Sequence, residues 1–120
     1  MKKGIVFIFV VGVFLSCQPS VKERDGIFLG GHIVNPSSRS VTLYQGSKVI
    51  EMLDLGENLR FQRQYDSLPD GIYKLEHLPE YQTLLLENQD SLWVRINAAA
   101  FDESMVYSGV GASKNNFLLE

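Results

Sequence analysis

Apolar and polar residues alternate in short runs along the chain from residue 27 onward. The clearest run covers residues 59–65, where Leu59, Phe61 and Tyr65 are separated by polar side chains. Alternation with a period of two is typical of a β-strand that buries one face. The run therefore predicts a strand whose Leu59, Phe61 and Tyr65 side chains face the core.

Residues 91–97 alternate in the same way. Leu92, Val94 and Ile96 fall on one face of the predicted strand, and Trp93 falls on the other. Because a strand points successive side chains to opposite faces, we expect the three aliphatic residues to be buried in the same core as Phe61.

Turn-forming residues separate these runs about every ten residues, a spacing typical of β-sandwiches and β-barrels. The turn signals lie at residues 35–38, 46–47, 56–58, 68–71 and 88–90. No stretch between Gly26 and Val110 keeps an apolar period of 3.6, so few helices are expected there. The pattern predicts an all-β domain, residues 26–112, of seven or eight strands in a small antiparallel sandwich or an open barrel.

The first sixteen residues have the pattern of an export signal. Lys2 and Lys3 precede a nearly unbroken apolar run, residues 4–15. As a helix this run spans about 18 Å, which is too short to cross a hydrocarbon core of roughly 30 Å. We therefore expect residues 1–16 to be a signal peptide.

The single cysteine, Cys17, follows this apolar run directly. Residues 14–17, FLSC, resemble the lipobox of bacterial lipoproteins, which implies that a signal peptidase cuts before Cys17 and that its thiol is lipid-modified. The alternative is an ordinary secreted protein with one free thiol, although exported proteins seldom keep one. Several acyl chains on one residue anchor a protein stably. We expect lipid anchoring in the cell envelope of a Gram-negative bacterium, at the outer membrane, with residues 17–25 as a polar tether.

The length and the charge limit the possible partners. At 120 residues the chain has room for one domain, and its net charge is −3. Without Lys2 and Lys3, nine basic residues face fourteen acidic ones. Nucleic-acid binding depends on neutralising phosphates with lysine and arginine, so we expect no nucleic-acid partner. The expected partners are the membrane, through the lipid on Cys17, and an unidentified protein or glycan.

The chain offers no residues at the spacing of a metal site. His32 and His77 lie in different predicted strands, without further ligands at suitable spacing, and we expect both on a half-solvated sheet surface. Acidic residues cluster at 51–57 and 102–103. Paired carboxylates can hydrolyse a glycosidic bond, but acidic residues in loops more often keep a protein soluble. We expect no enzymatic activity, no metal and no cofactor.

Aromatic residues are the remaining candidates for ligand contact. Trp93, Tyr73 and Tyr81 are candidates for stacking on a sugar or a peptide. The favoured interpretation is that they pack in the core, because aromatic residues are enriched in strands.

Residues 108–116, SGVGASKNN, follow the last predicted strand. Gly109 and Gly111 have the spacing of a phosphate-binding loop, but the third glycine and the surrounding β–α–β unit are missing. The alternative is that the two glycines let the chain leave the sheet and that Ser113 caps a helix. We expect residues 113–120 to be the beginning of a longer helix, cut short.

Three stretches carry a resemblance to a known family. They are DGIYKL (Asp70–Leu75), LLLENQDSLWV (Leu84–Val94) and YSGVGASKNNFLLE (Tyr107–Glu120). Together they resemble the N-terminal β-domain of exported bacterial lipoproteins that carry a thioredoxin-like domain further on. Residues 88–90, Asn-Gln-Asp, stand where that family has Pro-Gly-Asp. The family's active site is a Cys-x-x-Cys motif in the later domain, so the resemblance implies a β-fold and no catalytic residue here.

Three hypotheses about function follow. The first is a lipid-anchored, non-catalytic β-domain of the cell envelope that serves binding or spacing. The second is the accessory domain of a thiol-disulfide oxidoreductase whose catalytic part is absent from this chain. The third is a carbohydrate- or peptide-binding module that uses Trp93 and the tyrosines.

Overall fold

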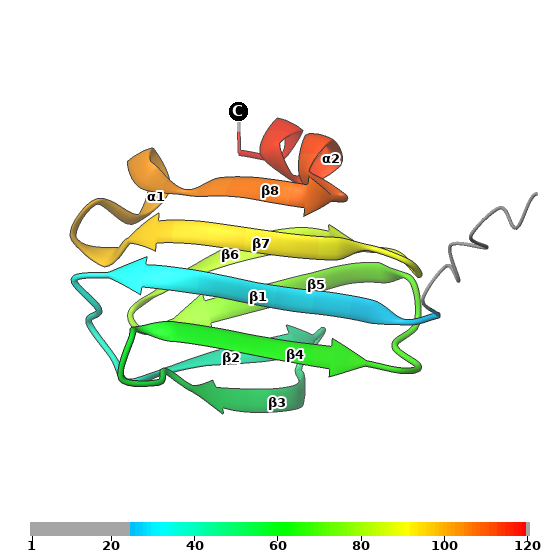
Figure 1. The fold of residues 1–120 in the computed structure, drawn as a ribbon, viewed down its shortest axis with the longest axis horizontal. Coiled ribbons are helices and arrows are strands. Elements are labelled where there is room, and N and C mark those ends of the chain that lie inside the picture. The colour runs from blue at the N-terminus through cyan, green and yellow to red at the C-terminus, as the bar shows by residue number, and fades with distance from the viewer. Residues whose placement is uncertain (1–24, 120) are drawn as a thin grey trace, which may run out of the picture.

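Two four-stranded β-sheets pack face to face in the computed structural model, which describes residues 25–119 (Figure 1). The first, which we call sheet A, has the strand order β4-β1-β7-β8, and the second, sheet B, has the order β3-β2-β5-β6. The expected all-β fold is confirmed, and of the two expected arrangements the chain adopts the sandwich. The expected signal peptide, Cys17 and the tether up to residue 24 lie outside the described residues.

The bounds of the elements follow the turn signals of the sequence. Sheet A contains β1 (Ile27–Val34), β4 (Arg60–Tyr65), β7 (Ser91–Asn97) and β8 (Val106–Val110). Sheet B contains β2 (Ser40–Gln45), β3 (Lys48–Asp54), β5 (Gly71–His77) and β6 (Glu80–Leu86). Three short helical segments complete the described part: η1 (Ala98–Ala100), α1 (Phe101–Ser104) and α2 (Ala112–Phe117).

The sandwich is not wholly antiparallel. Strands β1 and β7 pair in parallel, from Phe28 with Ser91 to Val34 with Asn97. Between β1 and β7 the chain passes through sheet B. The two strands are therefore not joined by a hairpin, the connection that makes consecutive strands antiparallel. The expected antiparallel arrangement holds for the other strand pairs given for the described residues.

The core lies between the two sheets, and the alternating residues supply it as predicted. Leu92, Val94 and Ile96 are fully buried, and Phe61 is 3% exposed. Leu59 is the exception, because it precedes β4 with a positive φ of 62° and is only half-buried. Its predicted place in the core is therefore wrong.

Gly31 lets the strands of sheet A pack closely beneath the core. A Cβ atom at this position would lie 2.7 Å from Cε1 of Phe61 and 2.7 Å from the carbonyl oxygen of Val94. Real Cβ atoms do not approach other atoms so closely, so only glycine fits between these two neighbours.

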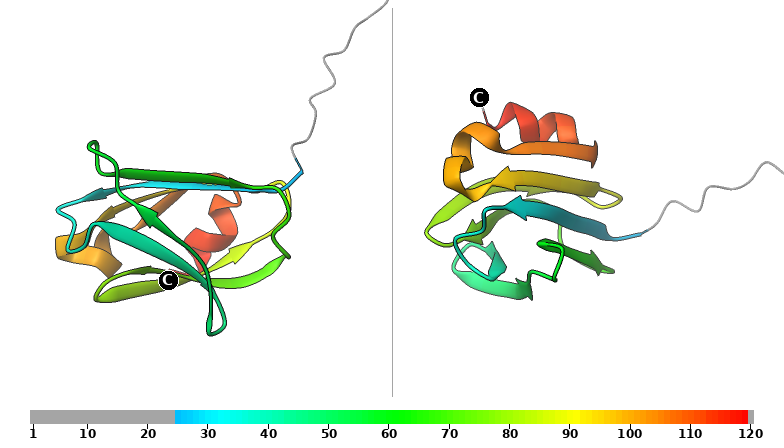
Figure 2. Two further views of the ribbon diagram at one scale, coloured as in Figure 1. Left: turned by 90° about the horizontal axis from the view of Figure 1, so that it is seen from below. Right: turned by 60° about the vertical axis from the view of Figure 1, so that its left-hand side comes forward.

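Helix α2 closes one side of the sandwich by pairing with both sheets (Figure 2). The Asn115 amide bonds the backbone N–H and C=O of Leu85 in sheet B, at 2.8 and 2.9 Å. The Asn116 amide does the same for Tyr107 in sheet A, at 2.9 and 3.0 Å. Two edge strands, β6 and β8, thus receive the hydrogen bonds that a further strand would give them.

The start of this helix differs from the prediction. Gly111, with a φ of +99°, is the N-cap residue, α2 begins at Ala112, and no side chain caps it. Ser113 therefore lies inside the helix, and its predicted capping role is wrong. Gly109 and Gly111 both have positive φ, and they let the chain leave β8 as the sequence indicated.

Candidate functional site

The most distinctive surface is the outer face of sheet A, where Trp93 rests on Gly30. The two residues are partners in the parallel pairing of β7 with β1. Cε3 and Cζ3 of Trp93 both lie 2.8 Å from the point that a Gly30 Cβ would occupy. The indole ring therefore lies across β1 against the backbone, instead of projecting into solvent.

Phe28 extends this aromatic surface along β1. Its Cζ atom lies 3.1 Å from the same Cβ point of Gly30, so the two rings adjoin. Both side chains are half-buried and keep part of their surface accessible. Because Gly30 has no side chain, it leaves room for both aromatic rings.

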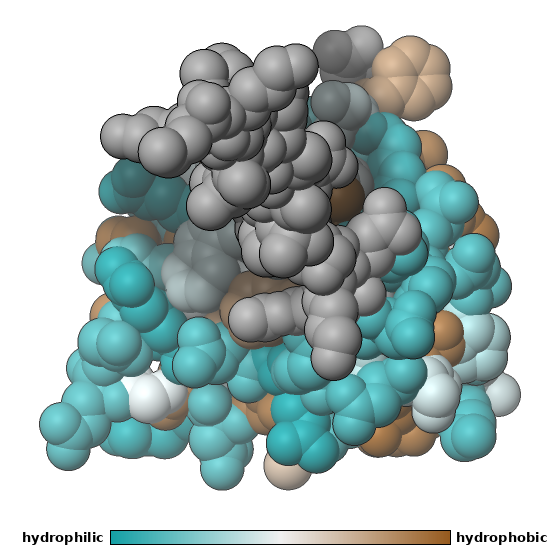
Figure 3. Space-filling view, turned by 45° about the vertical axis from the view of Figure 1, so that its right-hand side comes forward, coloured by the Kyte–Doolittle hydropathy of each residue, from teal (hydrophilic) through white to brown (hydrophobic). Residues whose placement is uncertain are grey.

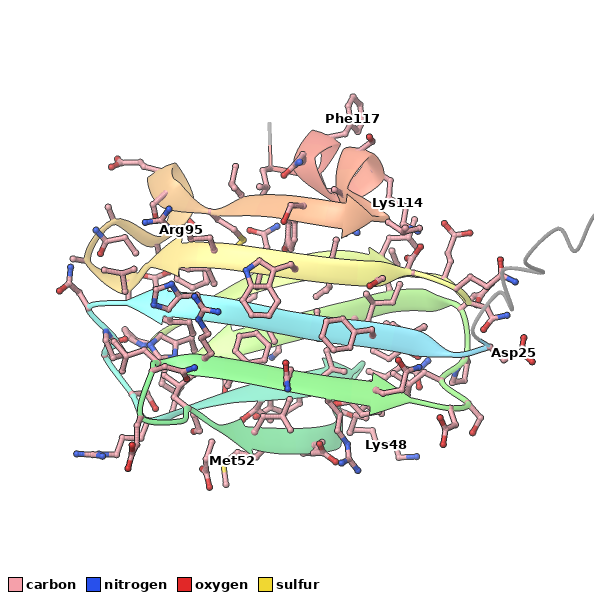
Figure 4. All side chains as sticks on the ribbon, viewed as in Figure 1. Asp25, Lys48, Met52, Arg95, Lys114 and Phe117 are labelled. Carbon is pink, nitrogen blue, oxygen red and sulfur yellow. The ribbon has the colours of Figure 1, made fainter. Side chains whose placement is uncertain are left out.

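Three basic side chains form a row beside the rings. His32 pairs with Arg60 in β4 and with Arg95 in β7, so the three side chains lie side by side across sheet A. The guanidinium carbon of Arg60 lies 5.7 Å from the centroid of the Trp93 ring, within the range of a cation–π contact. Arg95 lies toward the α1 end of the face (Figure 4). Within residues 25–119, no carboxylate pairs with either arginine.

We call this surface the sheet A outer face. Its residues are those that alternate with the core positions of the four strands. They are Phe28, Gly30, His32, Val34, Arg60, Gln62, Gln64, Ser91, Trp93, Arg95, Asn97, Val106, Ser108 and Val110. None of these described residues is acidic, although the chain has fourteen acidic residues. The face is therefore positive on a molecule whose net charge is negative.

A recess borders this face next to α1. It has a volume of about 360 Å³ and is lined by Val34, Arg95, Asn97, Ser104 and Val106. The Ser104 hydroxyl accepts from the Asn97 N–H at 2.8 Å and donates to the Asn97 carbonyl at 3.1 Å. These bonds tie the α1 side of the recess to the end of β7.

A second recess, of about 380 Å³, lies at the end of the sandwich between the β1–β2 and β3–β4 loops. Its lining includes Arg39 and Glu57, which carry opposite charges, and no aromatic residue. The opposite end, where β1 begins, has a mostly hydrophilic described surface with scattered hydrophobic residues (Figure 3). The sheet A outer face is the more specific candidate, because it combines aromatic rings with charge of one sign.

The three predicted stacking residues are not brought together. Trp93 lies on the sheet A outer face, as its position opposite Leu92 and Val94 predicted. Tyr73 is 1% exposed, and its hydroxyl donates to the Pro69 carbonyl, so its ring cannot stack on a ligand. Tyr81 is 59% exposed but belongs to the outer face of sheet B, on the other side of the molecule.

On the outer face of sheet B, which carries Tyr81, the aromatic rings contact a side chain of the same sheet. The Lys74 ammonium lies 4.4 Å from the ring centroid of Tyr44 and 5.3 Å from that of Tyr81. The Tyr44 hydroxyl donates to the Glu76 carboxylate at 3.2 Å, and desolvation, followed by this bond and the Glu76 charge, raises the pKa of the Tyr44 phenol. The outer face of sheet B thus pairs its rings with charges of both signs, whereas the arginines of the sheet A outer face have no carboxylate partner in residues 25–119.

The two histidines have different environments. His32 lies half-buried on an outer face, as expected. His77 is 1% exposed, so its predicted place on a half-solvated surface is wrong. Its Nε2 accepts the Ser37 N–H at 3.1 Å, which leaves Nδ1 to donate to the Ser40 carbonyl at 3.0 Å. The imidazole therefore holds the β1–β2 loop.

Within residues 25–119, no group of three or more histidine, cysteine or carboxylate side chains could hold a metal ion.

The turn between β8 and α2 is not arranged to hold a phosphate. A Cβ at Gly111 would lie 2.8–2.9 Å from the Asp90 carboxylate, which therefore occupies the space at the start of α2. Lys114 binds this carboxylate and that of Glu87. Burial lowers the pKa of the Lys114 ammonium, but its hydrogen bonds to Asp90 and Glu87 outweigh this effect and raise the pKa overall. An anion at this position would meet the negative charge of Asp90.

The other carboxylates that the sequence singled out lie apart. Glu51 pairs with Arg63 at 3.2 Å across the edge of the sandwich, while Asp54, Glu57, Asp102 and Glu103 are exposed. Among residues 25–119, no helix is long and apolar enough to cross a membrane.

Sequence reasoning singled out Trp93 on this face but missed Phe28, Arg60 and Arg95 as its neighbours. Alternation marks each of them as facing away from the core. That they lie together depends on β1 pairing with both β4 and β7, which residues distant in the sequence determine. Comparison of the chain with protein-family models, with curated proteins and with solved structures found no match.

Proposed function

We propose that the chain is a non-catalytic binding domain that a lipid on Cys17 holds at the outer membrane of a Gram-negative bacterium. We propose further that it binds through the sheet A outer face. One observation carries this proposal: the Trp93 ring lies against Gly30, beside two arginines that no carboxylate in residues 25–119 neutralises.

The residue types on this face support a binding role. Tryptophan and arginine are enriched at the positions that dominate binding energy. A charged face without neutralising partners also attracts ligands of opposite charge and brings no like charge against them.

The backbone beneath the face supports the same role. Strands β1, β4 and β7 are hydrogen-bonded neighbours, so the side chains of the face rise from a rigid surface rather than from a loop. Of the earlier hypotheses, this arrangement favours the carbohydrate- or peptide-binding module. The accessory role beside a thiol-disulfide oxidoreductase rests on the family resemblance alone.

The anchor and the binding face are tested separately. For the anchor, cells that express the full chain are fed a labelled fatty acid. We expect label on the wild-type protein and none on Cys17→Ser, which should be released from the membrane fraction. Unchanged membrane association and unchanged mass of Cys17→Ser would contradict the anchoring.

For the face, the fluorescence of Trp93 reports directly, because it is the single tryptophan of the chain. The purified full chain is mixed with protein, glycan and lipid fractions of an envelope extract. We expect at least one fraction to change the Trp93 emission saturably. No change with any fraction would contradict a binding role for this face.

A further inference from the structure

We infer that the ligand of the sheet A outer face is an acidic carbohydrate, a chain of sugars that carry carboxylate groups. This inference rests on the proposed binding function and specifies its ligand. It follows from three features of the face: two adjoining aromatic rings, two guanidinium groups on different strands, and neutral polar side chains around them.

The aromatic surface fits the C–H face of a sugar ring. The Trp93 ring lies against Gly30 and adjoins Phe28, so together they offer an apolar aromatic area on the outer face of the sheet. The face of an aromatic ring is electronegative and attracts the weakly positive C–H groups of a pyranose.

A membrane surface fits this geometry less well. Membrane-surface elements bury their apolar side chains several ångströms into the bilayer, whereas the Trp93 ring lies along the sheet. A Trp93 ring that lies along the sheet offers a surface on which a sugar ring can stack.

The arginines add selectivity for an acidic sugar. A guanidinium can donate two parallel hydrogen bonds to one carboxylate. Because the Arg60 guanidinium lies 5.7 Å from the Trp93 ring centroid, it can reach a carboxylate of a sugar that stacks on that ring. No acidic residue of the face would repel this group.

Arg95 extends the positive face beyond Arg60, and we expect a second sugar unit there. Arg60 in β4 and Arg95 in β7 are separated by β1, so their backbones are about 10 Å apart across the sheet. An oligosaccharide can offer a separate carboxylate to each of the two guanidinium groups. The recess beside Arg95, with a volume of about 360 Å³, continues the path beyond this second arginine.

Neutral side chains complete the surface. Gln62 and Ser108 lie in the same cross-strand row as Trp93. Asn97 lies in the row next to that of the two arginines. Their amides and hydroxyls both donate and accept hydrogen bonds, as do the hydroxyl groups of a sugar.

The test is a titration of the purified full chain with trigalacturonate, followed by Trp93 emission and by calorimetry. The neutral galactotriose is the matched control ligand. We expect a saturable change with the acidic trisaccharide, at least tenfold weaker binding of the neutral one, and weaker binding as salt is added.

Five variants test the residues. Arg60→Gln and Arg95→Gln should each weaken trigalacturonate binding at least fivefold, and Trp93→Ala should abolish it by calorimetry. Arg39→Gln, which makes the same change in an exposed loop at the end of the sandwich, should bind as the wild type does. Thermal unfolding identifies any variant that loses its fold, and Trp93→Phe, which keeps a ring, should retain part of the binding.

Several results would overturn the inference. Equal binding of the neutral trisaccharide would remove the role of the arginines. A response to vesicles of anionic phospholipid, without a response to trigalacturonate, would assign the face to the membrane. If an envelope protein fraction changes Trp93 emission and trigalacturonate does not, the inference fails while the proposed function stands. If nothing changes the emission, both fail.

Discussion

Two adjacent glycines in β1 do different work at the scale of single residues. Gly30 faces outward and supports the Trp93 ring, whereas Gly31 faces the core and admits Phe61 and Val94. Neither position tolerates a Cβ without movement of its neighbours, but the neighbours differ. At Gly30 they are side-chain atoms, and at Gly31 they include the Val94 carbonyl oxygen.

Alanine substitutions should separate these two roles. Gly31→Ala should lower the free energy of unfolding by about 1–3 kcal/mol, because backbone must shift to relieve the overpacking. Gly30→Ala should lower it less, because the Trp93 ring can tilt away, and the emission of the ring should move to longer wavelength. Denaturant unfolding followed by Trp93 fluorescence measures both effects. A larger loss for Gly30→Ala than for Gly31→Ala would contradict these roles.

Tyr107 in β8 buries a hydroxyl without a protein partner in the described residues. The residue is 4% exposed, and burial raises the pKa of its phenol. A buried hydroxyl without a hydrogen bond destabilises the folded state. Tyr107→Phe should therefore leave stability unchanged or raise it by about 1 kcal/mol. Tyr73→Phe is the control, because its hydroxyl is bonded to Pro69 and its loss should destabilise the protein. A clear loss of stability in Tyr107→Phe would contradict this reading.

The pKa of the Tyr65 phenol predicts how the stability of the fold changes at alkaline pH. Desolvation and the Glu51 carboxylate raise the pKa of its phenol from 10.0 to about 12, against a smaller opposing effect of Arg63. A raised pKa stabilises the fold fully below the unfolded value of 10.0, and this contribution is lost as the pH rises toward 12. The loss should be about 1–2 kcal/mol, since solvent screens part of the effect at this half-buried site. Denaturant unfolding below pH 10 and near pH 12 should show a smaller fall for Tyr65→Phe. An identical fall in both proteins would contradict this assignment.

At the scale of elements, α2 holds the two sheets together through two neighbouring amides. Asn115 is fully buried and bonds Leu85 of β6, while Asn116 bonds Tyr107 of β8. A six-residue helix gains little stability from its own hydrogen bonds. The amide contacts and packing against the sandwich therefore stabilise this helix, which in turn covers two strand edges.

Asn115→Ala should cost about 2–3 kcal/mol, because the fully buried Asn115 amide is lost and the N–H and C=O of Leu85 lose their partners. Asn116→Ala should cost less, because this half-buried site lets water replace part of the amide. Denaturant unfolding measures both, and hydrogen exchange should become faster at the Leu85 amide in Asn115→Ala. Costs below about 0.5 kcal/mol, as for an ordinary surface substitution, would show that α2 does not hold the sheets.

Part of this arrangement was predictable from the sequence, because side chains alternate between the two faces of a strand. Phe61, Leu92 and Trp93 face the predicted sides because alternation fixes each strand face locally. Tyr73 packs in the core, which was the favoured interpretation over ligand stacking, because its strand directs it inward from the Pro69 turn. Asn115 could not be assigned from sequence, since its partners lie thirty residues away in β6. Ser113 was wrongly assigned because Gly111 supplies the turn into the helix.

At the scale of the whole molecule, the two outer faces differ in kind. Sheet B carries rings and charges that pair with one another, as Tyr44, Lys74 and Glu76 do. Sheet A carries Trp93 beside two arginines without carboxylate partners in the described part of the chain. This asymmetry gives the sandwich one face that is suited to bind an anionic ligand.

The most direct test of this account is to map the bound surface by NMR. The isotope-labelled full chain is titrated with trigalacturonate, and backbone and indole N–H shifts are followed. The account predicts the largest changes at the Trp93 indole and at the amides of β1, β4 and β7, with little change in β2, β3, β5 and β6. Largest changes on the Tyr44 and Tyr81 surface of sheet B, or around Arg39 and Glu57, would contradict it.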